Sequence, residues 1–216
     1  MFAQDGIERW ASRRRVLRAG FATLLAAATL CAAANTGAAK KLLVVGDSLS
    51  SGYGLRDGES WVALLAQNLR GVEIINDSIS GDTTAGGVAR LPAVLRRVRP
   101  DWVIIELGGN DGLRGSSLGA MKKNLRGMVD AARAHGATPV LLGMRLPPNY
   151  GPRYTRDFER VYAEVAEESG AALLPFFLRG LEDGLHWFQD DQIHPNAAAQ
   201  PRIERNVREF LTGLWR

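Results

Sequence analysis

The chain has 216 residues, of which 46% are apolar and 23% are charged, and this composition excludes disordered, collagen-like and polytopic membrane proteins. Its single cysteine, Cys31, excludes a disulfide framework and a multi-cysteine metal site, and the spacing of the three histidines favours no metal or cofactor. The net charge of +4 comes mostly from residues 1–39, which hold five of the 27 basic and two of the 23 acidic residues. The rest of the chain has 22 basic and 21 acidic residues, so its charge indicates no nucleic-acid-binding face.

Residues 1–39 are predicted to be a cleaved export signal. A basic stretch at residues 12–18 precedes an apolar stretch from Ala19 to Leu30, and small residues follow up to Ala39. The apolar stretch is too short to span ~30 Å of hydrocarbon, which takes about 20 helical residues. The paired arginines resemble a twin-arginine signal, and an ordinary Sec signal is the alternative. We therefore expect a periplasmic or secreted protein with no stable membrane span in its mature part.

Residues 40–216 are predicted to form a single domain in which short apolar runs alternate with amphipathic ones. The apolar runs are of strand length, and most of them end at glycine or at a polar cluster, which is typical of buried strands. Five strands are expected, at residues 42–45, 72–75, 102–105, 139–142 and 172–174.

The amphipathic runs are predicted to be helices, because their apolar residues recur at helical spacing. Helices are expected at about residues 60–69, 86–95, 121–135, 158–165 and 203–214. Pro92 lies within the second helix, and the sequence leaves open whether it kinks that helix or marks its true start.

Alternating strands and helices indicate an α/β fold with a parallel five-stranded sheet covered on both faces. In such sheets ligands bind beyond the carboxyl ends of the strands. Polar clusters directly follow the first three expected strands. The sequence therefore predicts a functional site at that edge of the sheet.

The first two polar clusters offer a hydroxyl and a free backbone N–H. In residues 46–50, Ser48 lies on a strand-to-helix turn, where its Oγ can act as a nucleophile, and a simple capping turn is the alternative. In residues 78–84, Gly81 allows the backbone to approach a ligand closely, and a turn that caps the next helix is the alternative.

The third cluster and a C-terminal one offer an amide and a histidine base. Asn110 carries an uncharged donor that can face a developing oxyanion, and a simple Asx-turn is the alternative. Asp191 and His194 are three residues apart, so the carboxylate can accept from His194 Nδ1 and leave Nε2 free as a base. The other two histidines have simpler explanations in a helix end and in packing.

Together and in this order, the four clusters resemble the four sequence blocks of the SGNH (GDSL-type) hydrolase family, which is named for its Ser, Gly, Asn and His. Ser48, Gly81, Asn110 and His194 match those positions, and Asp191 matches the Asp of the family's Asp-x-x-His block. Residues 78–83, 106–115 and 145–151 look like the bacterial periplasmic branch described as thioesterases, lysophospholipases and arylesterases. The resemblance extends from residue 41 to about residue 214.

The resemblance implies a three-layer α/β/α, flavodoxin-like fold and a serine-esterase mechanism without a cofactor or a metal. Ser48 would attack an ester or thioester carbonyl, His194 would take its proton, and Asp191 would orient His194. The oxyanion hole would consist of the Ser48 and Gly81 N–H groups and the Asn110 amide.

The substrate is expected to be a small acyl ester or a lipid. Leu113, Leu146, Pro147 and Tyr150 lie on loops after the third and fourth strands, where they can line an acyl groove or simply pack the loops. Arg145 can meet a phosphate or carboxylate of the substrate, and a surface salt bridge is the alternative. Two other functions are alternatives to the acyl-ester hydrolase. One is a carbohydrate acetyl esterase, which shares the four blocks, and the other is a non-catalytic flavodoxin-like binding module.

Overall fold

A parallel five-stranded sheet forms the centre of the computed structural model, which describes residues 39–215. The predicted export signal lies almost wholly outside these described residues. The strand order is β2-β1-β3-β4-β5, with every neighbouring pair parallel. The strands are β1 (Lys40–Gly46), β2 (Val72–Asn76), β3 (Trp102–Glu106), β4 (Thr138–Leu142) and β5 (Ala172–Leu174).

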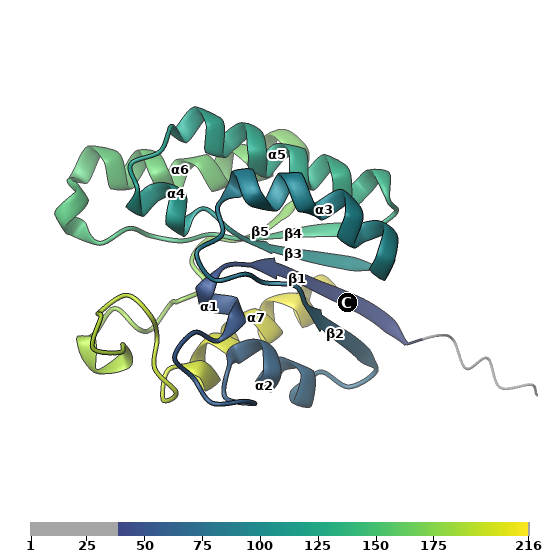
Figure 1. Cartoon of the computed structure of the whole chain (residues 1–216), viewed down its shortest axis with the longest axis horizontal. Helices are drawn as coiled ribbons and strands as arrows, with labels where there is room; N and C mark the ends of the chain where they lie inside the picture. Colours follow the sequence, from purple (N-terminus) through teal and green to yellow (C-terminus); the bar gives the residue numbers. More distant parts are fainter. Residues whose placement is uncertain (1–38, 216) are drawn as a thin grey trace, which may run out of the picture. The chain divides into compact units, whose positions relative to one another are not determined.

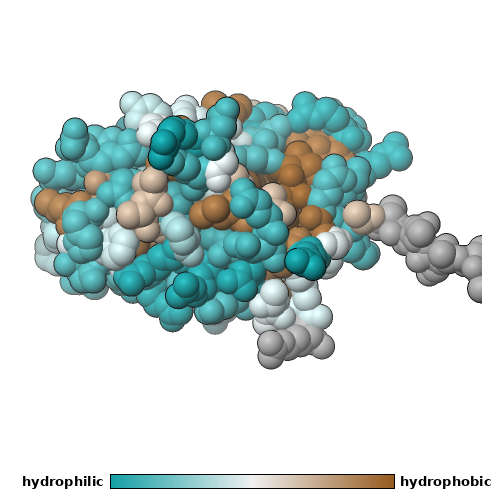
Figure 2. Space-filling model, turned by 90° about the horizontal axis from the view of Figure 1, so that it is seen from below, coloured by the Kyte–Doolittle hydropathy of each residue, from teal (hydrophilic) through white to brown (hydrophobic). Residues whose placement is uncertain are grey.

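Helices cover both faces of this sheet, so the predicted three-layer α/β/α fold is confirmed (Figure 1). One layer contains α3 (Thr84–Val98), α4 (Gly109–Leu113), α5 (Leu118–Ala134) and α6 (Pro152–Ser169). The other contains α1 (Ser48–Ser51), α2 (Trp61–Asn68) and α7 (Gln200–Leu214). Figure 2 shows that the outer face on the α2 and α7 side is mostly hydrophilic, as expected of amphipathic helices that pack one face on a sheet.

The three central strands carry the core. Residues 42–45, 103–105 and 140–142 are fully buried, because helices cover both faces of a parallel sheet and leave no solvent side for polar residues. The edge strands β2 and β5 are only half-buried. At the end of the β1 and β3 pair, Gly46 lies in register with Glu106.

Helix starts follow capping side chains more closely than they follow the apolar spacing. The Thr83 side chain accepts from the Gly86 N–H at 3.3 Å, so α3 begins at Thr84 and runs through Pro92. Pro92 therefore does not mark the start of that helix. Ser117 caps α5 in the same way and moves its start ahead of the expected residue 121.

The short elements were not expected from the sequence. These are α1, α4 and two 3₁₀ turns, η1 (Pro148–Tyr150) and η2 (Leu185–Trp187). Each is shorter than two helical turns, so it shows too little periodicity to detect. Within residues 39–215, no helix is both long enough and apolar enough to cross a membrane.

Candidate active site

The turn that follows β1 presents Ser48 at the carboxyl edge of the sheet. Asp47 is the N-cap of α1, and its Oδ1 accepts a hydrogen bond from the Leu49 N–H at 3.0 Å. Gly52 ends this helix with a left-handed φ of 84°. The cap and the serine thus belong to one unit, residues 47–51, which we call the Ser48 turn.

Three other elements hold the Ser48 turn in place. Trp61 Nε1 of α2 donates to the Leu49 carbonyl at 3.1 Å, and Asn76 Nδ2 of β2 donates to the Ser50 carbonyl at 2.8 Å. The Ser50 hydroxyl donates to Glu106 Oε2 at 2.5 Å, from beneath the turn. The turn is therefore fixed to the fold without using Ser48 Oγ.

His194 bridges Ser48 and Asp191. Its Nε2 lies 2.9 Å from Ser48 Oγ, and its Nδ1 lies 2.6 Å from Asp191 Oδ2, which is the contact expected from the three-residue spacing. Asp191 Oδ1 also accepts the backbone N–H groups of Ile193 and His194. Burial raises the pKa of Asp191, but these hydrogen bonds and the His194 charge outweigh it and lower that pKa to about 2. Asp191 is therefore an anion at every physiological pH.

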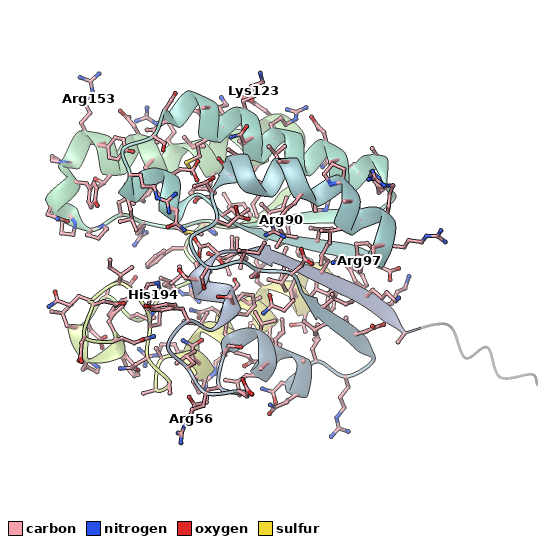
Figure 3. All side chains as sticks on the ribbon, in the orientation of Figure 1. Arg56, Arg90, Arg97, Lys123, Arg153 and His194 are labelled. Carbon is pink, nitrogen blue, oxygen red and sulfur yellow. The ribbon has the colours of Figure 1, made fainter. Side chains whose placement is uncertain are left out.

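The loop that carries His194 is tied to the loop after α1. In Figure 3, His194 lies beside α1, on the segment that precedes α7. Gln189 donates from its backbone N–H to the His194 carbonyl at 2.8 Å and from Nε2 to the Tyr53 carbonyl at 2.9 Å. The Tyr53 ring lies 4.5 Å from the His194 ring, between centroids. These contacts fix the imidazole against Ser48.

Two backbone N–H groups are available as donors, one of Ser48 itself and one of Gly81 on the loop after β2. Within residues 39–215, the N–H groups of Ser48 and Gly81 donate to no protein acceptor. Gly81 has a φ of 79°, which a side chain would strain, and Arg114 donates to its carbonyl at 3.1 Å. Arg114 thus holds the peptide that follows Gly81, while the Gly81 N–H is free for a ligand among the described residues.

Asn110, by contrast, uses both hydrogens of its amide. Nδ2 donates to Asp47 Oδ2 at 3.0 Å and to the Asp82 carbonyl at 2.9 Å. Asn110 therefore joins the Ser48 turn to the loop that carries Gly81. An arriving oxyanion has to compete with one of these two acceptors.

Contacts that could not be expected from the sequence hold the loop after β2. Arg90 of α3 pairs with Asp77 and Asp82 at 2.5 and 2.8 Å, and Figure 3 shows it turned toward that loop. The Thr84 N–H and hydroxyl both donate to Asp111 of α4, at 2.8 and 2.6 Å. No single-sequence signal pairs these residues, because the partners lie on different elements.

One buried carboxyl group belongs to the Ser48 turn and a second lies under it. Asp47 is 2% exposed and Glu106 is 0% exposed. Burial raises the pKa of Asp47 to about 6, against the lowering effect of the Leu49 N–H, of His194 and of Asn110. Burial and the neighbouring Asp47 raise the pKa of Glu106 well above its usual range. The sequence contained one signal for Glu106, a glutamate that closes an otherwise apolar strand.

An apolar cavity of about 600 Å³ opens beside Ser48, Asn110 and His194. Of the expected substrate residues, Leu113, Arg145, Leu146 and Pro147 line it. Tyr150 lies outside this lining. Its hydroxyl donates to the Leu113 carbonyl at 3.1 Å and its ring stacks on Tyr154, so it supports the wall of the cavity. The other apolar side chains of the lining include Met144, Phe176, Leu178, Leu181, Leu185 and Ile193.

Arg145 is already engaged in the wall of this cavity. Its guanidinium lies 4.5 Å from the Phe176 ring centroid and faces Glu159 at 3.4 Å and Glu182 at 3.8 Å. The two carboxylates offset its charge. A role for Arg145 in binding an anionic substrate would have to compete with them.

Comparison with known proteins finds the same family across most of the chain. The profile of the GDSL-like lipase/acylhydrolase family matches residues 44–201. The esterase TesA of Pseudomonas aeruginosa is 52% identical over 181 residues, covering 82% of this chain and 90% of that protein. The thioesterase 1/protease 1/lysophospholipase L1 of Escherichia coli is 46% identical over 167 residues, covering 77% and 80%. A crystal structure of the esterase EstA from Pseudoalteromonas sp., inhibited by monoethylphosphonate, superposes with a TM-score of 0.78 at 37% identity, covering 82% and 98%.

Proposed function

This chain belongs to the GDSL-like lipase/acylhydrolase family and is a carboxylic ester hydrolase, and on that premise we propose that Ser48 is its nucleophile, with His194 as base and Asp191 as the group that orients it. One observation carries this proposal. Ser48 Oγ, both nitrogens of His194 and the Asp191 carboxylate form a continuous hydrogen-bonded chain of 2.9 and 2.6 Å. The family membership also rules out the non-catalytic binding module.

The reaction follows from this chain of contacts. His194 Nε2 takes the Ser48 proton as Oγ attacks the acyl carbonyl, and the Asp191 anion stabilises the imidazolium that forms. His194 then gives the proton to the leaving alcohol or thiol, which leaves an acyl group on Ser48. Water, deprotonated by the same imidazole, attacks this acyl-enzyme and restores the free serine.

The tetrahedral oxyanion is proposed to bind the Ser48 and Gly81 N–H groups and the Asn110 amide. An anion accepts more strongly than a neutral carbonyl, so it displaces the Asp82 carbonyl from Asn110 Nδ2. Asp47 meanwhile keeps the other amide hydrogen and so fixes the orientation of Asn110. The donor is thus oriented before the reaction begins, which is the condition for effective oxyanion stabilisation.

Asn110→Ala is expected to lower kcat by roughly 10²–10³, with KM changed by less than about threefold, because the lost donor acts on the transition state. Steady-state kinetics on a p-nitrophenyl ester measures this split. Asn124→Ala is the matched control: its amide donates to Thr84 at 3.1 Å, at the start of α3, and it does not contact Asp47 or Asp82. A change mainly in KM for Asn110→Ala would place this amide against the bound substrate instead.

We propose that the substrate carries a medium-length or longer acyl chain, or an aryl group. The support is the cavity of about 600 Å³, whose lining is largely aliphatic and aromatic and which begins at Ser48. An acetyl group would fill only a small part of this volume. The family relatives named esterase and lysophospholipase agree with such substrates.

The ratio of kcat/KM for p-nitrophenyl octanoate to that for p-nitrophenyl acetate tests this substrate class. We expect a ratio on the order of 10², because each buried methylene contributes up to about 0.8 kcal/mol and only part of that is realised in binding. A preference for acetate would instead favour the carbohydrate acetyl esterase.

We further propose that residues 1–39 direct export, so that the mature enzyme acts in the periplasm or outside the cell. The support is their arrangement into a basic, an apolar and a small-residue stretch. Sequencing the N-terminus of the protein recovered from the periplasm tests this. Protein retained in the cytoplasm with residues 1–39 intact would contradict it.

A further inference from the structure

Glu106 closes β3 directly beneath the Ser48 turn. Its Oε2 accepts from the Ser50 hydroxyl at 2.5 Å and from the Asp47 N–H at 3.3 Å. Gly46, its register partner on β1, leaves the room for this contact, since a Cβ there would lie 2.4 Å from Glu106 Oε2 and 2.7 Å from Ser50 Oγ. The contact is thus built into the ends of the two central strands.

The surroundings of Glu106 do not suit a negative charge. Both hydrogen bonds go to Oε2, while Oε1 is buried and has no partner within residues 39–215. No lysine or arginine in this part of the chain forms an ion pair with Glu106, and the titratable groups that face it are Asp47 and Tyr162. Tyr162 turns its hydroxyl to the Leu107 carbonyl at 3.0 Å. The two hydrogen bonds to Oε2 favour the charged form, but burial and the second carboxyl beside it outweigh them and penalise an anion more than a neutral acid.

We infer that Glu106 is a positioning residue for ester hydrolysis, which holds the Ser48 turn from beneath through the Ser50 hydroxyl and the Asp47 N–H, and does so as a neutral carboxylic acid. This inference rests on the proposal that Ser48 is the nucleophile. Oε2 accepts both hydrogen bonds, as the carbonyl oxygen of a neutral acid can. The raised pKa of Glu106, caused by burial and by Asp47, agrees with this protonation state.

The neutral form has a consequence for the oxyanion hole. With Glu106 uncharged, Asp47 is the one anion of the pair, and its Oδ2 orients the Asn110 amide. A second negative charge under the turn would work against the oxyanion that forms above it. Glu106 thus provides one oxygen that accepts two hydrogen bonds and adds no charge to the site.

Two substitutions of Glu106 separate its shape from its charge. Leu removes the acceptor at a similar volume, whereas Gln keeps a carbonyl oxygen for Ser50 and Asp47 and is neutral at every pH. Displacements of about 1 Å at a nucleophile can cost on the order of 10² in rate. We expect Glu106→Leu to lower kcat and the rate at which a fluorophosphonate labels Ser48 by about that factor, with KM within about threefold. Glu106→Gln should restore both to within about fivefold of the unmodified enzyme.

A matched control is Glu204→Leu, which removes another buried glutamate, paired with Arg208 on α7 at 2.7 Å. It should change stability and leave the labelling rate of Ser48 unaltered. If Glu106→Leu does not fold, Ser50→Ala removes the same contact from the other side and should lower the labelling rate about tenfold.

The protonation state has its own readout in thermal unfolding. The unfolded chain ionises Glu106 in the ordinary glutamate range, but the folded chain keeps it neutral to a higher pH, so this residue costs increasing stability as the pH rises. The melting temperature of Glu106→Gln minus that of the unmodified enzyme should therefore grow from pH 5 to pH 8. Asp47 is present in both proteins, so its own titration largely cancels in the difference.

The possible failures can be told apart. A melting-temperature difference that stays constant with pH, or a Glu106→Gln variant as slow as Glu106→Leu, would overturn the neutral acid. A Glu106→Leu variant that labels at the normal rate would overturn the positioning role. If the unmodified enzyme were not labelled at Ser48 at all, the proposed nucleophile would be wrong instead.

Discussion

Ser48→Ala is expected to lower kcat for p-nitrophenyl esters by on the order of 10⁶, because no covalent intermediate can form without the hydroxyl. The fold should remain. Within residues 39–215 the only hydrogen bond of the Ser48 hydroxyl is with His194, and the turn is held separately by Trp61, Asn76 and Glu106. Loss of one partly exposed hydrogen bond costs about 1 kcal/mol. Turnover and thermal unfolding, measured on the same sample, check both halves of this expectation.

Ser51→Ala is the control on the same turn. The Ser51 hydroxyl contacts Ser80 at 2.8 Å instead of His194, so this variant should retain most of its activity. Mass analysis after treatment with a fluorophosphonate should find the adduct on Ser48 in Ser51→Ala and none in Ser48→Ala. An adduct on another residue, or a loss of cooperative unfolding in Ser48→Ala, would make Ser48 a structural residue.

The architecture was predictable because the information that fixes it is local. Apolar runs such as residues 42–45 and 102–105 have the length and the flanking glycines of buried strands, and all five expected strands are present. Local signals left the start of α3 open, because they did not decide between the capping side chain of Thr83 and Pro92. Thr83 starts α3 well ahead of Pro92, and a proline in the helix interior is tolerated because Leu91, Val94 and Leu95 bury the same face.

The candidate site was predictable only in part. The three-residue spacing of Asp191 and His194 predicts their contact, since one turn of loop brings the two side chains together. Ser48 is 146 positions from His194, and their proximity could be expected only from the family resemblance. Glu106 was not selected because its partners, Ser50 and the Asp47 N–H, become neighbours only when β1 and β3 pair.

His194→Ala is expected to lower kcat about as much as Ser48→Ala, on the order of 10⁶, because the nucleophile and its base act as a unit. Asp191→Ala should cost less, about 10⁴, since the imidazole remains and loses only its orienting anion. Some of that loss comes from the loop, because Asp191 also accepts the Ile193 and His194 N–H groups. The expected order of damage is therefore Ser48 and His194 first, followed by Asp191.

The neighbouring Asp190 gives this order a sharp control. It has the same side chain one position earlier and is exposed, and no hydrogen bond or ion pair of its carboxylate is present among residues 39–215. Asp190→Ala should therefore keep kcat within about threefold, as is usual for an exposed residue without a specific contact. Kinetics of the two variants at one pH decide the matter. If Asp190→Ala lowered kcat more than Asp191→Ala, the carboxylate that orients His194 during turnover would be that of Asp190. The loop would then have to rearrange before the reaction.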